Sequence, residues 1–192
     1  MTEKDTTVRV WDPLVRAFHW LLASAFLIAW LTEDDWLDLH VPAGYTVLGL
    51  VMFRVVWGVI GTRHARFTGF VRSPATTLAY LKDVMAVRAR RYLGHNPAGG
   101  AMVIALLLSL TITTVSGLAL YGYNEFSGPL AELMFSAPSW LGSPLEGIHE
   151  FFASFTVLLI SLHVAGVALT SLLHRENLVR SMFTGHKQQE TS

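Results

Sequence analysis

The sequence contains no cysteine. This excludes disulfides, iron–sulfur clusters held by cysteine thiolates, and prosthetic groups attached through thioether bonds. Any metal or metal-containing group that the chain binds must be held by other side chains, and its eight histidines are the candidate ligands.

Charged residues are also scarce. They make up 15% of the 192 residues, whereas about a quarter is typical of soluble domains. Hydrophobic residues make up 52%, so the composition indicates an integral membrane protein in contact with lipid. The formal net charge is +0, and we therefore expect no nucleic-acid partner. The length predicts a single membrane domain over residues 1–192.

The sequence contains long apolar runs. A bilayer is crossed by about 20 residues of helix, and four runs are long enough: residues 14–31, 41–60, 101–122 and 148–173. We expect an all-α, four-transmembrane-helix bundle. Asp12 before Pro13 is a favoured N-cap before a favoured first residue, which predicts the start of the first helix. Ser143 and Glu146 have the capping-box spacing at the start of the fourth.

Positive charge is missing from two of the connections. Lys and Arg occur before the first run, between the second and third, and after the fourth. In the other two connections all the charged residues are acidic, namely Glu33, Asp34, Asp35, Asp38, Glu125, Glu132 and Glu146. The positive-inside rule therefore predicts that both termini are cytoplasmic and that residues 123–147 form a periplasmic loop.

The long cytoplasmic connection contains a segment of mixed character. Ser73-Pro74 begins a stretch in which apolar residues lie on one side and basic residues are close by. We expect residues 74–92 to include an amphipathic helix on the membrane surface. Its apolar side consists of Leu78, Leu81, Val84 and Met85.

Four histidines lie inside or at the ends of the apolar runs, where polar side chains generally face a partner or a cofactor. If the helices alternate in direction, His40 and His149 share a depth near the outer face. His163 follows His149 by roughly 21 Å of helix axis, about 9 Å from the inner edge of a core about 30 Å thick. His19 lies roughly 7 Å inside that edge. The spacing predicts two pairs, His40 with His149 and His19 with His163.

Two facing histidines are the ligand set that holds a haem iron from both sides. Because no coordination position stays open, this arrangement favours electron transfer over oxygen binding. Two such haems in one bundle would make an electron path across the bilayer. Gly44, Gly49, Gly117 and Gly166 would let a flat macrocycle approach the helix backbones.

Two arginines fit the same interpretation. Arg54 follows His40 by 14 residues, at the depth of the inner pair, and Arg16 lies one turn before His19. A buried arginine needs an anionic partner, so both are candidates for binding haem propionates.

Simpler interpretations remain open. A membrane histidine can hydrogen-bond a neighbouring helix, and Arg54 can pair with a carbonyl. His174 is a rival for His163 on the same face, although it would lie beyond the inner edge of the core. We expect His64, His95 and His186 to be solvated, and the Ser and Thr residues of 109–116 to pack between helices. A proton or metal transporter that uses the histidines, and a passive membrane anchor, are alternative classes.

The chain resembles the bacterial di-haem b-type cytochromes of the cytochrome b561 and nickel-hydrogenase cytochrome b subunit superfamily. The resemblance covers almost the whole chain and rests on the order and spacing of VWDPLVRAFHW, LHVPAGYTVLGLVMFRVVWGVIGTRHARF, YLGHNPAGGAM and IHEFFASFTVLLISLHVAGV. It implies two non-covalent haem b groups with His19, His40, His149 and His163 as ligands. It also implies a quinone site near the GHNPAGG turn, where His95 and Asn96 are candidates.

The resemblance further implies a location in the bacterial inner membrane. The protein would move electrons between a periplasmic redox protein or catalytic partner subunit and the quinone pool. It would act either as a freestanding quinone oxidoreductase or as the cytochrome subunit of a hydrogenase or dehydrogenase complex. Members that dock large partners often have extra chain, and this chain is short, which counts against a dedicated hydrogenase partner.

Overall fold

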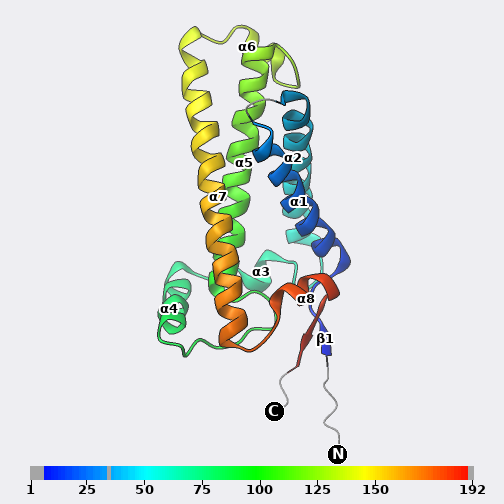
Figure 1. Ribbon diagram of the computed structural model, residues 1–192, viewed down its shortest axis with the longest axis vertical. Coiled ribbons are helices and arrows are strands. Elements are labelled where there is room, and N and C mark those ends of the chain that lie inside the picture. Colours follow the sequence, from blue (N-terminus) through cyan, green and yellow to red (C-terminus); the bar gives the residue numbers. More distant parts are fainter. Residues whose placement is uncertain (1–6, 34–35, 190–192) are drawn as a thin grey trace, which may run out of the picture. The chain divides into compact units, whose positions relative to one another are not determined.

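The computed structural model describes residues 7–33 and 36–189, and Figure 1 shows its elements. Asp34 and Asp35 of the first acidic connection lie outside the described residues. In chain order the elements are β1 (Thr7–Arg9), α1 (Pro13–Leu31), α2 (Leu37–Ile60), α3 (Phe67–Phe70), α4 (Pro74–Met85), α5 (Pro97–Glu125), α6 (Ala131–Phe135), η1 (Ser139–Leu141), α7 (Gly142–Leu173), α8 (Leu178–Thr184) and β2 (His186–Gln188).

Four helices, α1, α2, α5 and α7, are long and apolar enough to cross a membrane. Many of their large apolar side chains are exposed, such as Leu21, Val59 and Leu162, as expected of side chains that face lipid. The chain is therefore a mostly helical, multi-pass membrane protein, and the prediction of four membrane-length helices is confirmed.

Three of these helices begin earlier than the apolar runs that predicted them. α2 begins at Leu37, α5 at Pro97 and α7 at Gly142. For α5 the cause is a polar cap, because the Asn96 Oδ1 accepts a hydrogen bond from the Gly99 N–H at 2.7 Å. Such caps satisfy the free N–H groups of a first turn whether or not that turn is apolar. At α1 the predicted cap is confirmed, since the Val15 N–H donates to Asp12 Oδ1 at 2.9 Å.

The contacts divide the chain into two compact units. Unit 1 takes in the described residues of Met1–Trp20, Phe53–Ile104 and Ser161–Ser192. Unit 2 takes in those of Leu21–Met52 and Ala105–Ile160. Each of the four long helices contributes residues to both units.

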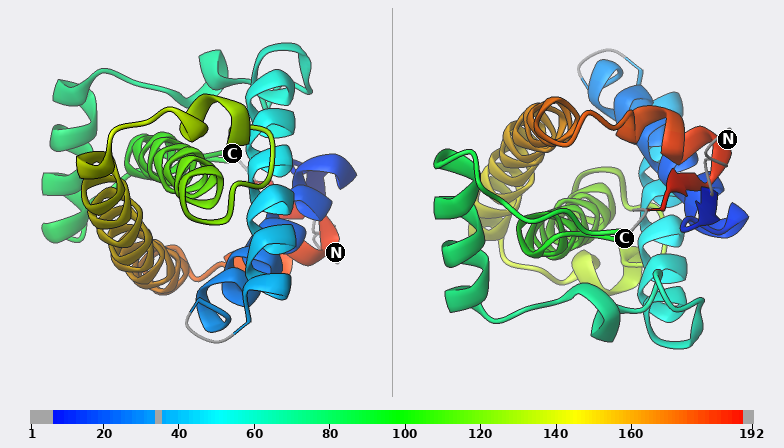
Figure 2. Two further views of the ribbon diagram at one scale, coloured as in Figure 1. Left: turned by 90° about the horizontal axis from the view of Figure 1, so that it is seen from above. Right: turned by 90° about the horizontal axis from the view of Figure 1, so that it is seen from below.

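In unit 1 the two ends of the described chain are paired. β1 and β2 form an antiparallel ladder in which Val8 lies opposite Lys187, and Figure 2 shows the two strands beside α8. Gly185 ends α8 with a φ of 84° and accepts hydrogen bonds from the N–H groups of Val10 and Trp11. Val10, Trp11, Val15 and Ala65 form a small buried cluster next to this sheet.

Unit 1 also contains the amphipathic segment predicted for residues 74–92. It is helical only over α4, Pro74–Met85. The predicted start is confirmed, because the Thr76 N–H donates to the hydroxyl oxygen of Ser73 at 3.2 Å. Beyond Met85 the chain runs as an irregular connection to α5.

Unit 2 is held together by small polar side chains between α5 and α7. The hydroxyls of Ser109 and Thr156 lie 2.7 Å apart and are buried. Thr113 and Ser116 donate to carbonyls one turn back, at Ser109 and Ile112. The Ser109–Thr156 contact joins the two helices, while the bonds of Thr113 and Ser116 satisfy their hydroxyls within α5. The expectation that the Ser and Thr residues of 109–116 pack between helices is thus confirmed for Ser109 and stays a prediction for the others.

Candidate functional site

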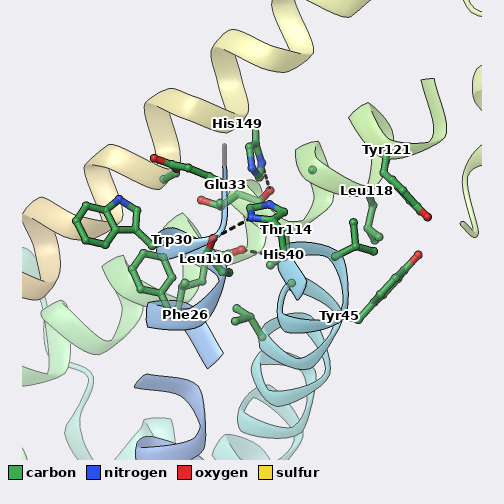
Figure 3. Close-up of a pocket in the computed structure, with 17 residues that line it drawn as sticks. Phe26, Trp30, Glu33, His40, Tyr45, Leu110, Thr114, Leu118, Tyr121 and His149 are labelled. Atoms are coloured by element: carbon green, nitrogen blue, oxygen red, sulfur yellow. Dashed lines mark hydrogen bonds between the residues drawn. The ribbon is translucent and has the colours of Figure 1, made fainter. Parts of the chain in front are cut away.

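His40 and His149 face each other in unit 2. Their ring centres lie 5.9 Å apart with an angle of 72° between the ring planes. The Nδ1 of His40 lies 2.9 Å from the carbonyl oxygen of Ala29, and the Nδ1 of His149 lies 2.9 Å from that of Thr113 (Figure 3). A carbonyl oxygen only accepts hydrogen bonds, so both Nδ1 atoms carry the proton. Each Nε2 therefore keeps a free lone pair, as a metal-binding imidazole requires.

The pocket around this pair is largely aromatic and aliphatic. Phe26, Trp30, Tyr45, Leu110 and Tyr121 are among its lining residues (Figure 3). Sequence reasoning missed these five. Helical spacing could have found Tyr121, which lies four residues after Gly117 on the same side of α5.

Two glycines keep the backbone close to this pocket. A Cβ at Gly117 would lie 2.8 Å from Cε1 of His149, so the ring packs directly on the backbone of α5. Gly44 lines the same pocket, and a Cβ there would meet nothing within 4 Å. The space beside Gly44 suits the edge of a flat group. Gly49 and Gly166 also have open space around them but are exposed.

His19 and His163 form the second pair, in unit 1. Their ring centres lie 6.4 Å apart with an interplanar angle of 50°. Trp20 packs edge-on against His19 at 5.0 Å. The Nδ1 of His19 is buried and has no hydrogen-bond partner among the described residues. The pairs that lie together are therefore those that depth matching predicted, while their role as ligands stays a prediction.

Both ring separations fit one iron held between two imidazoles. Two metal–nitrogen bonds of about 2 Å, with roughly 1 Å from each nitrogen to its ring centre, separate the ring centres by about 6 Å. Within residues 7–33 and 36–189, no three His, Asp or Glu side chains converge as a bare metal ion would require. A pair of ligands instead suits an iron whose other four positions are filled by a porphyrin.

Arg54 is a buried cation with an unused donor in unit 1. It is 3% exposed, and one guanidinium nitrogen donates to the carbonyl of Ala65 at 3.0 Å. Its guanidinium also lies 4.9 Å from the ring centre of Phe67, whereas Nη1 has no partner in the part of the chain that the structure describes. The alternative interpretation, in which Arg54 pairs with a carbonyl, therefore accounts for only one of its hydrogen-bond donors. A carboxylate would satisfy the rest.

Arg16 is similar. One of its terminal nitrogens donates to the carbonyl of Phe183, whereas its buried Nε has no partner. Every buried side-chain polar atom without a partner in the described residues belongs to unit 1. The set is Arg16 Nε, His19 Nδ1, Trp20 Nε1, Arg54 Nη1, His95 Nδ1 and His174 Nε2. Since buried polar groups are nearly always satisfied, this concentration fits a binding site for a group with polar substituents.

His95 is half-buried with its Nδ1 shielded from solvent, and the expectation that it is solvated is wrong. Its ring lies 4.7 Å from that of Trp11 and 4.6 Å from that of Phe70. Burial, followed by the charge of Arg54, lowers the pKa of His95 to about 3, so the imidazole is neutral. The sequence-based expectation failed because the basic residues near His95 in the chain do not form its surroundings. His64 is half-buried and His186 is exposed.

Asn96 and the neighbouring cavity complete the unit 1 site. The amide oxygen of Asn96 is used as the cap of α5. A cavity of about 150 Å³ lies beside His95 and is also lined by His64, Phe70 and Tyr92. Arg63 and Arg72 make the lining of this cavity cationic.

Four membrane-length helices that present two facing pairs of histidines define the class of integral-membrane b-type cytochromes. More particularly, the chain belongs to the prokaryotic cytochrome b561 family, whose model matches residues 10–185. Haem binding and transmembrane electron transport are properties that this membership implies.

Curated relatives match over most of their length. A protein of Rhodobacter capsulatus named as a Ni/Fe-hydrogenase B-type cytochrome subunit is 24% identical over 96% of this chain and 82% of its own. Proteins with the same name from Azotobacter chroococcum and Cupriavidus necator are 25% and 27% identical, over 95% and 93% of this chain and 89% and 86% of their own. No solved structure matches the chain significantly.

Proposed function

We propose that this protein is the membrane cytochrome b subunit of a hydrogenase-type complex and carries electrons between a catalytic partner subunit and quinone. The observation that carries the proposal is the geometry of the two histidine pairs. Each pair has the ring separation of two imidazoles on one iron. In the His40–His149 pair, both rings are also held in the tautomer that leaves Nε2 free.

The chain's own residues supply the binding and orientation of two haem b groups. The carbonyls of Ala29 and Thr113 hold the rings of His40 and His149 and increase the basicity of Nε2. Arg54 and Arg16 hold unused donors that would bind haem carboxylates beside His19 and His163. When bound, haem supplies an iron that alternates between the ferrous and ferric states. The mostly apolar lining of the pocket around His40 would limit the access of water to a haem bound there.

A quinone headgroup would bind in the cavity beside His95. The imidazole of His95 is neutral at physiological pH, and its Nδ1 has no other partner. A neutral imidazole can donate an N–H to a quinone carbonyl or take up a hydroquinone proton. Because Asn96 already caps α5, His95 is the stronger candidate for this contact.

The arrangement in the membrane follows from charge. We place both termini on the cytoplasmic side of a bacterial inner membrane, residues 123–147 in the periplasm and the segment 74–92 at the cytoplasmic surface. The confinement of Lys and Arg to three of the five extramembrane segments supports this topology. The chain then acts as one membrane domain over residues 1–192.

The comparisons favour a subunit over a freestanding oxidoreductase. The relatives named above are called hydrogenase cytochrome subunits, and this chain covers 82–89% of their length. The short chain is therefore a weaker argument against a hydrogenase partner than its length alone suggested. Purification in a mild detergent tests this, because a subunit should bring a second polypeptide in constant ratio.

Haem content is the decisive measurement for the cytochrome itself. We expect a dithionite-reduced minus oxidised spectrum of b-type, and pyridine haemochrome quantitation of two haems per chain. His149→Ala should remove one haem and leave the other, and His163→Ala should do the converse. A colourless protein expressed with haem available would overturn the proposal and favour the transporter class.

A further inference from the structure

Helix α4 leaves an apolar stripe uncovered in unit 1. Leu78, Leu81 and Met85 recur at the spacing of one helix face and are 55%, 42% and 77% exposed. Val87, just beyond the helix, is 73% exposed. None of these residues lies in a membrane-length helix. Their exposure is therefore not explained by the lipid that surrounds the spanning helices.

On the other side of α4, Tyr80 packs on the connection that follows the helix. Tyr80 is buried, and its ring meets that of Tyr92 edge-on at 5.7 Å. Its hydroxyl donates to the carbonyl of Arg90 at 3.4 Å. Ser73 caps the first turn. The direction of the stripe is therefore set by contacts that do not involve the stripe itself.

Val87 ends α4 in a conformation that does not suit a valine. Its φ is 56°, and its N–H donates to the carbonyl of Val84 while that of Arg88 donates to Asp83. This is the Schellman arrangement, in which the left-handed position favours glycine. A β-branched side chain is strained there. This conformation leaves the side chain of Val87 exposed beside the stripe.

The axis of α4 runs across that of the last part of α7 (Figure 2). In Figure 2, α4 is seen from the side, whereas the last part of α7, which belongs to the same unit, is seen nearly end-on. A helix whose axis runs across a membrane-spanning helix lies parallel to the membrane surface. Amphipathic helices that bind at the interface take this orientation, with the apolar face toward the acyl chains.

The charges next to the stripe are almost all positive. Residues 72–90 contain the cations Arg72, Lys82, Arg88 and Arg90 and one acid, Asp83. Asp83 is already paired with Arg88 at 2.8 Å. Lys82 and Arg90 are exposed. Basic residues beside an interfacial helix attract anionic lipid headgroups.

We propose that α4 is an interfacial helix that binds anionic phospholipid, with Leu78, Leu81 and Met85 among the acyl chains and Lys82 and Arg90 at the phosphates. The proposal does not depend on haem or on a partner subunit. It assigns to the connection between α2 and α5 a lipid-binding role beyond electron transfer.

The absence of cysteine makes a direct test possible. Single cysteines at Met85 and at Ala79, which lies on another side of α4, would carry a nitroxide in the otherwise unchanged haem-loaded protein. Power-saturation EPR compares collisions with oxygen, which concentrates in lipid, and with a nickel chelate, which stays in water. In phosphatidylcholine vesicles containing phosphatidylglycerol, the oxygen-to-nickel ratio at Met85 should exceed that at Ala79 by about threefold or more.

The same Met85 label tests whether the basic residues of α4 attract anionic lipid. The ratio at Met85 should be lower in pure phosphatidylcholine, and K82E with R90E should remove the difference between the two lipids. Three results would overturn the proposal: equal water access at both positions, a Met85 label reached by neither reagent, or no dependence on phosphatidylglycerol. The second of these would assign the stripe to a protein contact.

Discussion

At the scale of the residue, the His149 ring depends on the absence of a side chain opposite it. Its Nδ1 is bound by the Thr113 carbonyl, and Gly117, one turn further along α5, leaves room for the ring. The contact would not exist with any Cβ at Gly117 in place, because 2.8 Å is well below van der Waals separation. One missing side chain and one carbonyl thus set the direction of a candidate ligand.

Gly117→Leu should therefore remove one haem. We expect the haem content to fall by about half, because His149 must leave the position in which it faces His40. Pyridine haemochrome quantitation measures this. Gly49→Leu is the matched control, since a Cβ at Gly49 meets nothing within 4 Å and the residue is exposed. Full haem content in the Gly117 variant would contradict the assigned role of His149.

Glu33 is the charged residue that lines the His40–His149 pocket, and no Lys or Arg is among the lining residues that the structure describes. Negative charge stabilises ferric over ferrous haem and so lowers the midpoint potential. Glu33→Gln should raise the potential of one haem by roughly 30 mV at low ionic strength, and less in salt. Spectroelectrochemical titration measures this. Glu132→Gln, an exposed acid outside that lining, should leave both potentials unchanged.

At the scale of the element, the start of α1 shows how one side chain serves several purposes. Asp12 accepts hydrogen bonds from the N–H of Val15, the hydroxyl of Thr62 and the indole of Trp57. Burial alone would raise the pKa of this carboxyl, but these hydrogen bonds outweigh it and hold the pKa below 3.8. The charged form of Asp12 therefore ties the first helix to the segment after α2.

The sign of this shift fixes the pH dependence. Because the folded protein holds the pKa of Asp12 below its unfolded value, the stabilisation is complete at neutral pH and is lost as the pH falls through the folded pKa. Asp12→Asn keeps the cap but removes the charge, so it should lower stability at pH 7 and weaken the loss of stability below pH 4. Asp12→Ala should cost about 1 kcal/mol more. Thermal unfolding in detergent from pH 3 to 7 checks both.

At the scale of the whole molecule, the proposed topology makes opposite predictions for two segments. Single cysteines at Glu132 and Lys82 in this cysteine-free chain can be labelled in intact cells with a membrane-impermeant maleimide. We expect labelling at 132 without permeabilisation and at 82 only after it, because the lysines and arginines are retained on the cytoplasmic side. The reverse pattern would place both termini outside.

Much of the architecture was predictable because it depends on local properties. The length of an apolar run decides whether a helix can span a bilayer, and Asp12-Pro13 and Ser73-Pro74 are local start signals that the structure confirms. The pairing of the four histidines was also accessible, because a helix rises by a constant amount per residue. The extra first turn of α2 was not anticipated, because its residues are less apolar than the run that follows, whereas α7 begins one residue before Ser143, which was predicted to cap it.

The sequence by itself determined the four helices, the segregation of charge and which histidines share a depth, since each follows from regular helix geometry and the cost of polar groups in lipid. Only the tertiary structure decided which ring atoms are free. The carbonyls that hold His40 and His149 lie 11 and 36 residues away. It also decided that the ring of His95 packs against Trp11 and Phe70. Contacts between distant parts of the chain leave no periodic signal, and the chemistry of the two sites depends on them.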